Sequence, residues 1–145
     1  MTLIKKHIDN SLSVKLEGKK ESIYELENLC EEIGDLWNLN SKNRFTLNLL
    51  LEEIISNIIF YGFDNSEAKY IEVVANKEGD LINVQISDNG IPFNMLEIES
   101  KPKEVKLEEK EVGGLGIHLV KNLSESIDYM YQNGKNVLTI QINIS

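Results

Sequence analysis

The segment LNLLLEEIISNIIFYGF, residues 47–63, places a carboxylate and an amide in an otherwise apolar run. Glu53 and Asn57 are four residues apart, so on a helix they share one face. Polar side chains among apolar neighbours cost free energy unless they find partners. The pair is therefore a candidate site in which a carboxylate works beside an amide. A helix-surface charge and a satisfied core amide are the structural alternatives.

A second candidate lies in VQISDNGIPFN, residues 84–94, where a strand pattern runs into Asp88 and Gly90. A plain turn aspartate is the structural interpretation. The chemical interpretation is a buried carboxylate that accepts a hydrogen bond from a ligand amine. Gly90 would then allow a flat ring to approach the backbone.

A third candidate is EVGGLGIHLVKNLS, residues 111–124, in which Gly113, Gly114 and Gly116 precede an amphipathic helix pattern. Free N–H groups and a partial positive charge at a helix start form an anion site. The segment lacks the Walker pattern and the third glycine of a Rossmann fingerprint. A flexible loop before a helix is the alternative.

Hydrophobic periodicity predicts the elements that must position these residues. Asn133-Gly134 is a strong hairpin turn signal, Ser41 is expected to cap the second helix, and Gly62 is expected to end it. The sum is an α/β fold, a two-layer sandwich of a mixed, mostly antiparallel sheet covered by helices, with one helix buried. The expected elements are a strand at 11–18, helices at 22–37, 41–62 and 116–126, and hairpins at 70–88 and 127–144.

Composition limits the function classes. A chain of 145 residues predicts a single domain, 1–145. Its net charge of -9 argues against nucleic acid as a direct partner. Cys30, the one cysteine, excludes an intramolecular disulfide or a cysteine-rich zinc site, and its helical apolar pattern predicts a buried, inert thiol. The sequence has no apolar run of membrane-spanning length and no signal-peptide pattern, so we expect a cytoplasmic protein without membrane partners.

As a set, the three candidates resemble a known superfamily. Glu-x-x-x-Asn on a helix, Asp-x-Gly after a strand and a glycine-rich helix start, in this order, resemble its N, G1 and G2 boxes. This is the GHKL superfamily of histidine-kinase-like ATPases, which has the Bergerat fold. The segments SDNGIPFN, EEKEVGGLGIHLVKNL and GKNVLTIQ are similar in sequence to those of stand-alone bacterial anti-sigma factor serine/threonine kinases. The resemblance extends from about residue 11 to the end.

The resemblance implies a role for each matched residue. Glu53 matches the acidic residue that activates the attacking hydroxyl as a general base. Asn57 matches the ligand of the Mg²⁺ that bridges the phosphates of ATP. Asp88 matches the residue that binds the adenine amino group, and Gly90 matches the next position of the same box.

For the phosphates, the resemblance implies a cradle from Gly114, Leu115, Gly116 and Ile117, with Gly113 and His118 beside it. His118 is either a phosphate neighbour or a packing residue. Residues 94–112 would be the ATP lid, where one of Lys101, Lys103, Lys106 and Lys110 is a candidate phosphate contact. Pro92 stands where the longer form of the G1 box has its second glycine, a variant familiar among the anti-sigma kinases.

Two functions are expected from this resemblance. The first is a kinase that binds MgATP, phosphorylates Ser or Thr of an anti-anti-sigma factor with the STAS fold, and regulates transcription by partner switching. A sigma factor and a second copy of the chain are further expected partners. The alternative is a nucleotide-binding regulatory module that sequesters a partner without kinase activity. A plain ATPase or a response-regulator-linked module is a third interpretation, while a histidine kinase fits poorly because no dimerisation helices carry His7 or His118.

Overall fold

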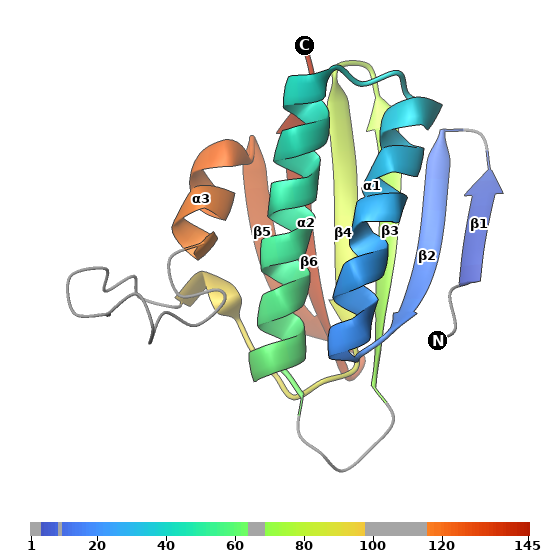
Figure 1. Ribbon diagram of the computed structural model, residues 1–145. Coiled ribbons are helices and arrows are strands. Elements are labelled where there is room, and N and C mark those ends of the chain that lie inside the picture. The colour runs from blue at the N-terminus through green and yellow to red at the C-terminus, as the bar shows by residue number, and fades with distance from the viewer. Residues whose placement is uncertain (1–3, 9, 64–68, 98–115) are drawn as a thin grey trace, which may run out of the picture.

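The computed structural model describes residues 4–8, 10–63, 69–97 and 116–145 of the chain. The described elements follow the predicted order, with one additional strand at the N-terminal end (Figure 1). They are β1 (Ile4–Ile8), β2 (Ser11–Glu17), the 3-10 turn η1 (Lys20–Ser22), α1 (Ile23–Leu36), α2 (Ser41–Tyr61), β3 (Tyr70–Glu78), β4 (Leu81–Asp88), the 3-10 turn η2 (Met95–Glu97), α3 (Gly116–Leu123), β5 (Ser126–Gln132) and β6 (Lys135–Asn143).

The six strands form one sheet in the order β1-β2-β3-β4-β6-β5. All five pairings between the described strands are antiparallel, so the described sheet has no parallel pair although a mixed one was expected. The helices α1, α2 and α3 lie on one face of this sheet (Figure 1). The predicted two-layer α/β sandwich is therefore confirmed.

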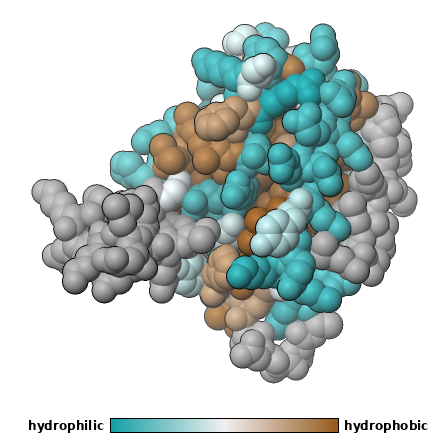
Figure 2. Space-filling model, in the orientation of Figure 1, coloured by the Kyte–Doolittle hydropathy of each residue, from teal (hydrophilic) through white to brown (hydrophobic). Residues whose placement is uncertain are grey.

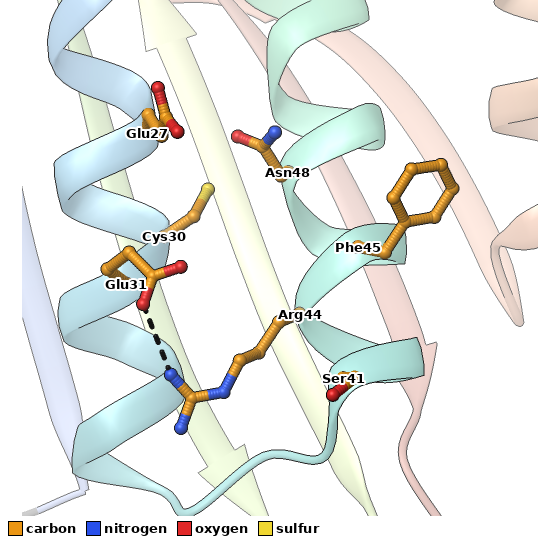
Figure 3. A pocket seen from close by; sticks show the side chains of 7 residues that line it. All are labelled: Glu27, Cys30, Glu31, Ser41, Arg44, Phe45 and Asn48. Atoms are coloured by element: carbon orange, nitrogen blue, oxygen red, sulfur yellow. Dashed lines mark hydrogen bonds and ion pairs between the residues drawn. The ribbon is translucent and has the colours of Figure 1, made fainter.

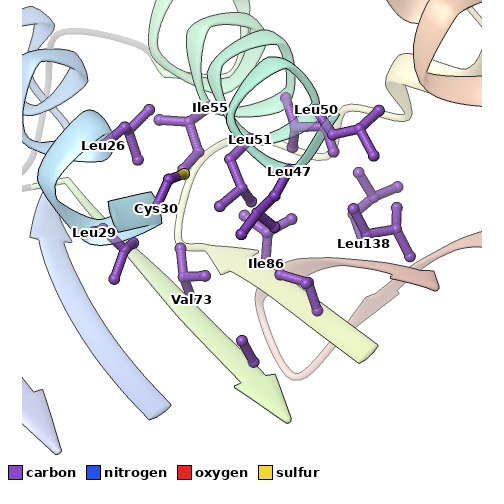
Figure 4. Packing of buried hydrophobic residues seen from close by; sticks show 14 of the residues in the cluster. Leu26, Leu29, Cys30, Leu47, Leu50, Leu51, Ile55, Val73, Ile86 and Leu138 are labelled. Carbon is purple, nitrogen blue, oxygen red and sulfur yellow. The ribbon is translucent and has the colours of Figure 1, made fainter. Parts of the chain in front are cut away.

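Helix α2 is long, and much of its surface is buried, as its apolar sequence predicts. Leu47, Leu50, Leu51 and Ile54 are fully buried. Figure 4 shows side chains of α1 and α2 pointing toward apolar residues of the strands, among them Val73 on β3. Burial of a side chain of this size stabilises the fold by about 1.5–3 kcal/mol, so the core holds α2 firmly against the sheet.

Not every apolar residue of α2 is buried, since Phe45 is 69% exposed. It lies in the second turn of α2. Leu119 and Leu123 of α3 are also exposed. Figure 2 shows apolar atoms gathered on the helical face of the molecule. Apolar periodicity indicates which face of a helix points toward the core, but it does not indicate how much of that face other elements cover.

Helix ends differ from the expected ones by a few residues. The side chain of Asn40 caps α2 by accepting a hydrogen bond from the amide of Asn43 at 2.8 Å, so Ser41 is the first helical residue and not the cap. Gly62 ends α2 as predicted. Helix α3 ends at Leu123 instead of residue 126, because the chain enters β5 at Ser126.

The two predicted hairpins are present. Asn133 and Gly134 both have positive φ angles, 54° and 76°, as a two-residue type I′ turn between β5 and β6 requires. Gly79, at the turn between β3 and β4, also has a positive φ. The pairing of β4 with β6, which are not consecutive strands, places Asp88 opposite Asn136. Among the described residues, no helix combines the length and the apolar character needed to span a bilayer.

Candidate nucleotide site

The Glu53–Asn57 pair forms as the helical spacing predicts. Asn57 Nδ2 donates a hydrogen bond to Glu53 Oε2 at 3.1 Å. Asn57 is fully buried, while Glu53 is partly exposed. Burial raises the pKa of the Glu53 carboxyl, the hydrogen bond from Asn57 opposes this shift, and the neighbouring Glu52 carboxylate adds to it. A carboxyl group with a raised pKa is suited to accept a proton near neutral pH.

The oxygen of the Asn57 amide is the notable atom of this pair. Asn57 Oδ1 is buried and has no hydrogen-bond partner, although its Nδ2 donates to Glu53 and lies 4.0 Å from the Met95 sulfur. An unpaired buried acceptor costs about 1–3 kcal/mol. A buried polar group without a partner needs an explanation in a folded protein, and one explanation is that the group binds an ion or a water molecule. A neutral amide oxygen is a ligand that Mg²⁺ accepts.

Gly116, the first residue of α3, lies directly against this pair. A Cβ atom added to Gly116 would overlap the carboxyl carbon and Oε1 of Glu53. The start of α3 therefore approaches Glu53 as closely as it does only because residue 116 is a glycine. The helix start and the Glu53 carboxylate consequently belong to one site.

Asp88 ends β4 and is almost completely buried, with 3% of its surface exposed. Its Oδ1 accepts hydrogen bonds from the amide of Gly90 at 2.8 Å and from Asn136 Nδ2 at 3.0 Å. Burial raises the pKa of Asp88, and these two hydrogen bonds oppose the shift. Among the described residues, none donates a hydrogen bond to Oδ2, so one carboxylate oxygen remains for a ligand amine.

Gly90 has a close-approach role. A Cβ atom at this position would overlap the carbonyl oxygen of Gly62 and lie 2.7 Å from the Phe63 ring. The next residue, Ile91, donates its amide to the same Gly62 carbonyl at 2.9 Å. The loop after β4 is thus packed against the C-terminal end of α2.

The segment that follows joins the two halves of the site. The Phe93 ring lies beside Tyr61 of α2, with centroids 6.4 Å apart, and Met95 reaches the Asn57 amide. Lys121 of α3 donates to the Leu96 carbonyl at 2.8 Å. Residues 88–97 therefore run from the carboxylate at the end of β4 to the Glu53–Asn57 pair.

The remaining predicted site residues fall into two groups. Ile117 is buried in the apolar core and His118 is exposed on α3. Gly113, Gly114 and Leu115 lie outside the described residues, as do Lys101, Lys103, Lys106 and Lys110 with most of the predicted lid. The roles assigned to these residues remain predictions.

Sequence reasoning missed Asn136, Tyr129 and Met95. The Asn136 side chain contacts Asp88, and the Tyr129 hydroxyl donates to Asn136 Oδ1. Asn136 and Tyr129 come from the β5–β6 hairpin, and the pairing of β4 with β6 brings them to the site, whereas Met95 follows β4 on η2. The hairpin motif around Asn136 was the one local signal available.

A separate pocket of about 290 Å³ lies between α1 and α2 (Figure 3). Arg44 lies at this pocket and forms an ion pair with Glu31 at 3.4 Å. It also pairs with Asp35 at 2.8 Å and donates from Nε to the Leu39 carbonyl. Cys30 faces the same pocket, and burial raises the pKa of its thiol to about 12. The arrangement ties the two helices together.

The groups of this site could hold an exocyclic amine and a divalent cation. A buried carboxylate with one free oxygen suits an exocyclic amine, and an unpaired amide oxygen beside a raised-pKa carboxyl suits Mg²⁺ and a hydroxyl nucleophile. The family model for the histidine kinase-like ATPase domain matches residues 16–142. The chain belongs to this family.

Several relatives within the family are named serine-protein kinases or anti-sigma factors, which confirms the resemblance seen in the sequence. The chain is 26% identical to the serine/threonine-protein kinase BtrW of Bordetella bronchiseptica, over 89% of this chain and 88% of that protein. It is 26% identical to the serine-protein kinase RsbW of Bacillus mycoides, over 88% and 81%. It is 22% identical to the anti-sigma F factor of Clostridium perfringens, over 92% and 95%.

Proposed function

We propose that this protein is an anti-sigma-factor-type serine/threonine kinase that binds MgATP and phosphorylates a STAS-fold anti-anti-sigma protein. The observation that carries the proposal is the pairing of Glu53 with Asn57, whose amide oxygen is buried without a partner. A scaffold that only holds a partner has no need of this costly pair. The names of the kinase relatives support the same activity.

In this proposal Asn57 would hold Mg²⁺ through Oδ1, and the bound ion would supply positive charge against the phosphates. Asp88 accepts the adenine amine through Oδ2, and the backbone at the start of α3 faces the phosphates. Guanine offers a carbonyl where adenine offers an amine, so an acceptor at Asp88 disfavours GTP. The described residues thereby account for base selection and for metal binding with separate groups.

The phosphoryl transfer needs few side chains. The serine or threonine oxygen of the partner forms a bond to the γ-phosphorus, and the bond from that phosphorus to the β–γ bridging oxygen breaks. ADP leaves with the electron pair, and the hydroxyl proton passes to Glu53. Burial keeps the pKa of Glu53 above its ordinary value, which favours acceptance of that proton.

Regulation follows from the charge of the product. A phosphate on the partner adds about −1.5 to −2 charges at the interface, which is enough to weaken a complex formed without it. We propose that the kinase, once released, holds a sigma factor and acts in the cytoplasm on transcription. We also propose one ATP-binding domain over residues 1–145, a lid near 94–112, and a homodimer.

The direct test is transfer of labelled phosphate from Mg-ATP to the STAS-domain proteins of the same organism. The native chain is expected to label one of them on Ser or Thr. Glu53→Gln should still bind nucleotide but lose transfer by about 100-fold, the usual scale of general-base catalysis. Glu125→Gln changes an exposed carboxylate between α3 and β5 and should transfer normally. Binding without transfer to any STAS protein would leave the nucleotide-binding regulatory module as the function.

A further inference from the structure

Asn136 is a buried residue on β6, and its side-chain amide forms hydrogen bonds with Asp88 and with residues near Asp88. Its side chain is 4% exposed, and it lies opposite Asp88 in the register of β4 and β6. We propose that Asn136, held by Tyr129, is the positioning residue that fixes Asp88 and the following loop for adenine. This inference rests on the nucleotide-binding function proposed above.

The NH₂ group of the Asn136 side chain donates hydrogen bonds to two partners. Asn136 Nδ2 donates to Asp88 Oδ1 at 3.0 Å and to the Ile91 carbonyl at 2.8 Å. The first bond sets the rotation of the carboxylate, and the second bond holds the loop three residues further on. A single NH₂ group thus fixes the carboxylate relative to the backbone that a flat ring would approach.

The acceptor half is also fully used. Asn136 Oδ1 accepts from the Phe93 amide at 2.9 Å and from the hydroxyl of Tyr129 on β5. With both donors on its oxygen, the amide can take only one orientation, because a flip would set its NH₂ group against them. Tyr129 therefore determines which end of Asn136 faces Asp88.

The consequence is a carboxylate with one defined free acceptor. Asp88 Oδ1 is occupied by Gly90 and Asn136, and Oδ2 receives no hydrogen bond from the described residues. Asn136 has no donor left for a ligand, since both of its N–H groups are in use. It acts on the nucleotide through Asp88 and is not a ligand of adenine itself.

The titration of Asp88 reports the effect of Asn136 on this carboxyl group. Ile71 faces it from β3 and Asn136 from β6, and the phenol of Tyr129 stays neutral because burial raises its pKa. Helix α2 contributes the Glu53 carboxyl to the site, and this group is unchanged in every variant compared below. Loss of the Asn136 donor should raise the pKa of Asp88, since a hydrogen bond to the charged form is removed.

The test is calorimetric titration of the full chain with Mg-ATP from pH 4.5 to 8, for native protein and Asn136→Asp. This variant keeps the volume and an acceptor oxygen, loses both donors, and places a second carboxyl group beside Asp88, which also raises the pKa of Asp88. The dissociation constant for Mg-ATP is expected to rise about tenfold or more at neutral pH. The acidic midpoint at which affinity is lost should move upward by about one pH unit.

Two further variants sharpen the experiment. Asn83→Asp makes the same change on β4, in a hydrogen-bond network with Asn76 and Gln141, and it should bind Mg-ATP as the native chain does. Tyr129→Phe removes only the hydroxyl that orients Asn136. It should weaken binding by about two- to threefold and shift the midpoint in the same direction.

The outcomes separate the two proposals. A native chain that is folded and binds no adenine nucleotide overturns the proposed function, and the positioning role falls with it. If the native chain binds and Asn136→Asp retains both the affinity and the acidic midpoint, the positioning role alone is wrong. Should Asn136→Asp fail to fold, judged by its thermal midpoint, Tyr129→Phe decides, and an unchanged profile there overturns the inference.

Discussion

Asn57 donates to Glu53 at 3.1 Å while its own oxygen stays buried and unpaired. The pair therefore costs the apo protein stability that an apolar pair of the same shape would not. A cost of this kind is expected at a functional site, where the group is kept for its ligand.

Asn57→Leu is expected to separate stability from binding. The change removes the unpaired oxygen at similar volume, so the free energy of unfolding of the apo protein should stay within about 1 kcal/mol of native, or rise. Binding of Mg-ATP should be lost, because the amide ligand is gone. Denaturant melts and calorimetry measure the two quantities. A large loss of stability with nucleotide binding intact would contradict this account of Asn57.

Gly116→Ala is expected to disturb the site although it replaces no polar side chain. The added methyl would overlap the Glu53 carboxyl, so either the carboxylate or the start of α3 must move. Mg-ATP affinity or phosphoryl transfer should fall by about tenfold or more, as small displacements of reacting groups commonly cause. Asn122→Ala, an exposed change on the same helix, is the control. Equal activity of the two variants would show that Gly116 is not needed for the approach.

Asp88→Asn tests the pH dependence of stability. The folded-state pKa of Asp88 is raised by burial, so its neutral form is favoured in the folded state. This contribution is present below the unfolded pKa of about 3.9 and is lost as the pH rises through the folded value. The asparagine oxygen can accept the same two hydrogen bonds and carries no charge.

Relative to native, Asp88→Asn should therefore gain stability as the pH rises from 4 to 7, while losing ATP binding. Unfolding curves at several pH values measure the difference. A difference that does not change with pH would mean that the buried carboxylate carries no cost, contrary to this account.

Cys30 is expected to be inert in the folded protein. With a pKa of about 12, its thiolate fraction at pH 8 is roughly a thousandfold below that of a free cysteine. A thiol reagent should modify the native chain very slowly and the denatured chain rapidly. Because the sequence contains one cysteine, the signal has one source. Rapid modification under native conditions would contradict the packing described between α1 and α2.

Arg44→Met is expected to loosen the connection between α1 and α2. Its Nε bond to the Leu39 carbonyl is lost together with two partly exposed ion pairs, for a cost of about 1–2 kcal/mol. Lys42→Met on the exposed start of the same helix should change stability by less than about 0.5 kcal/mol. Equal effects of the two changes on chemical denaturation would rule out this structural role.

The parts of the site predicted from the sequence are those set by local spacing. Glu53 and Asn57 meet because a helix brings residues four apart together, and Asp88 and Gly90 lie within one turn. Strand alternation and the Asn133-Gly134 turn fixed the hairpins in the same way. Such contacts need no knowledge of how distant segments pair.

Asn136 could not be placed in this way, because 48 residues separate it from Asp88. Their contact depends on the register of β4 and β6, which are not consecutive strands, so the burial of one face of the sheet and no hairpin turn sets it. The N-terminal strand β1 was missed, and the cap of α2 fell on Asn40 where Ser41 offers the same kind of oxygen. Local chemistry could not distinguish two adjacent capping residues.

The central proposal is an adenine-selective, magnesium-dependent site built on Asn57 and Asp88. Its most direct test is the thermal midpoint of the native chain, Asn57→Ala and Asp88→Asn with Mg-ATP, Mg-ADP, Mg-GTP, or ATP with a chelator. At about 100 times its dissociation constant, a ligand stabilises by about 2.7 kcal/mol. The account predicts a rise with magnesium and adenine nucleotides only, and no rise in either variant. An unchanged native midpoint with every nucleotide would contradict it.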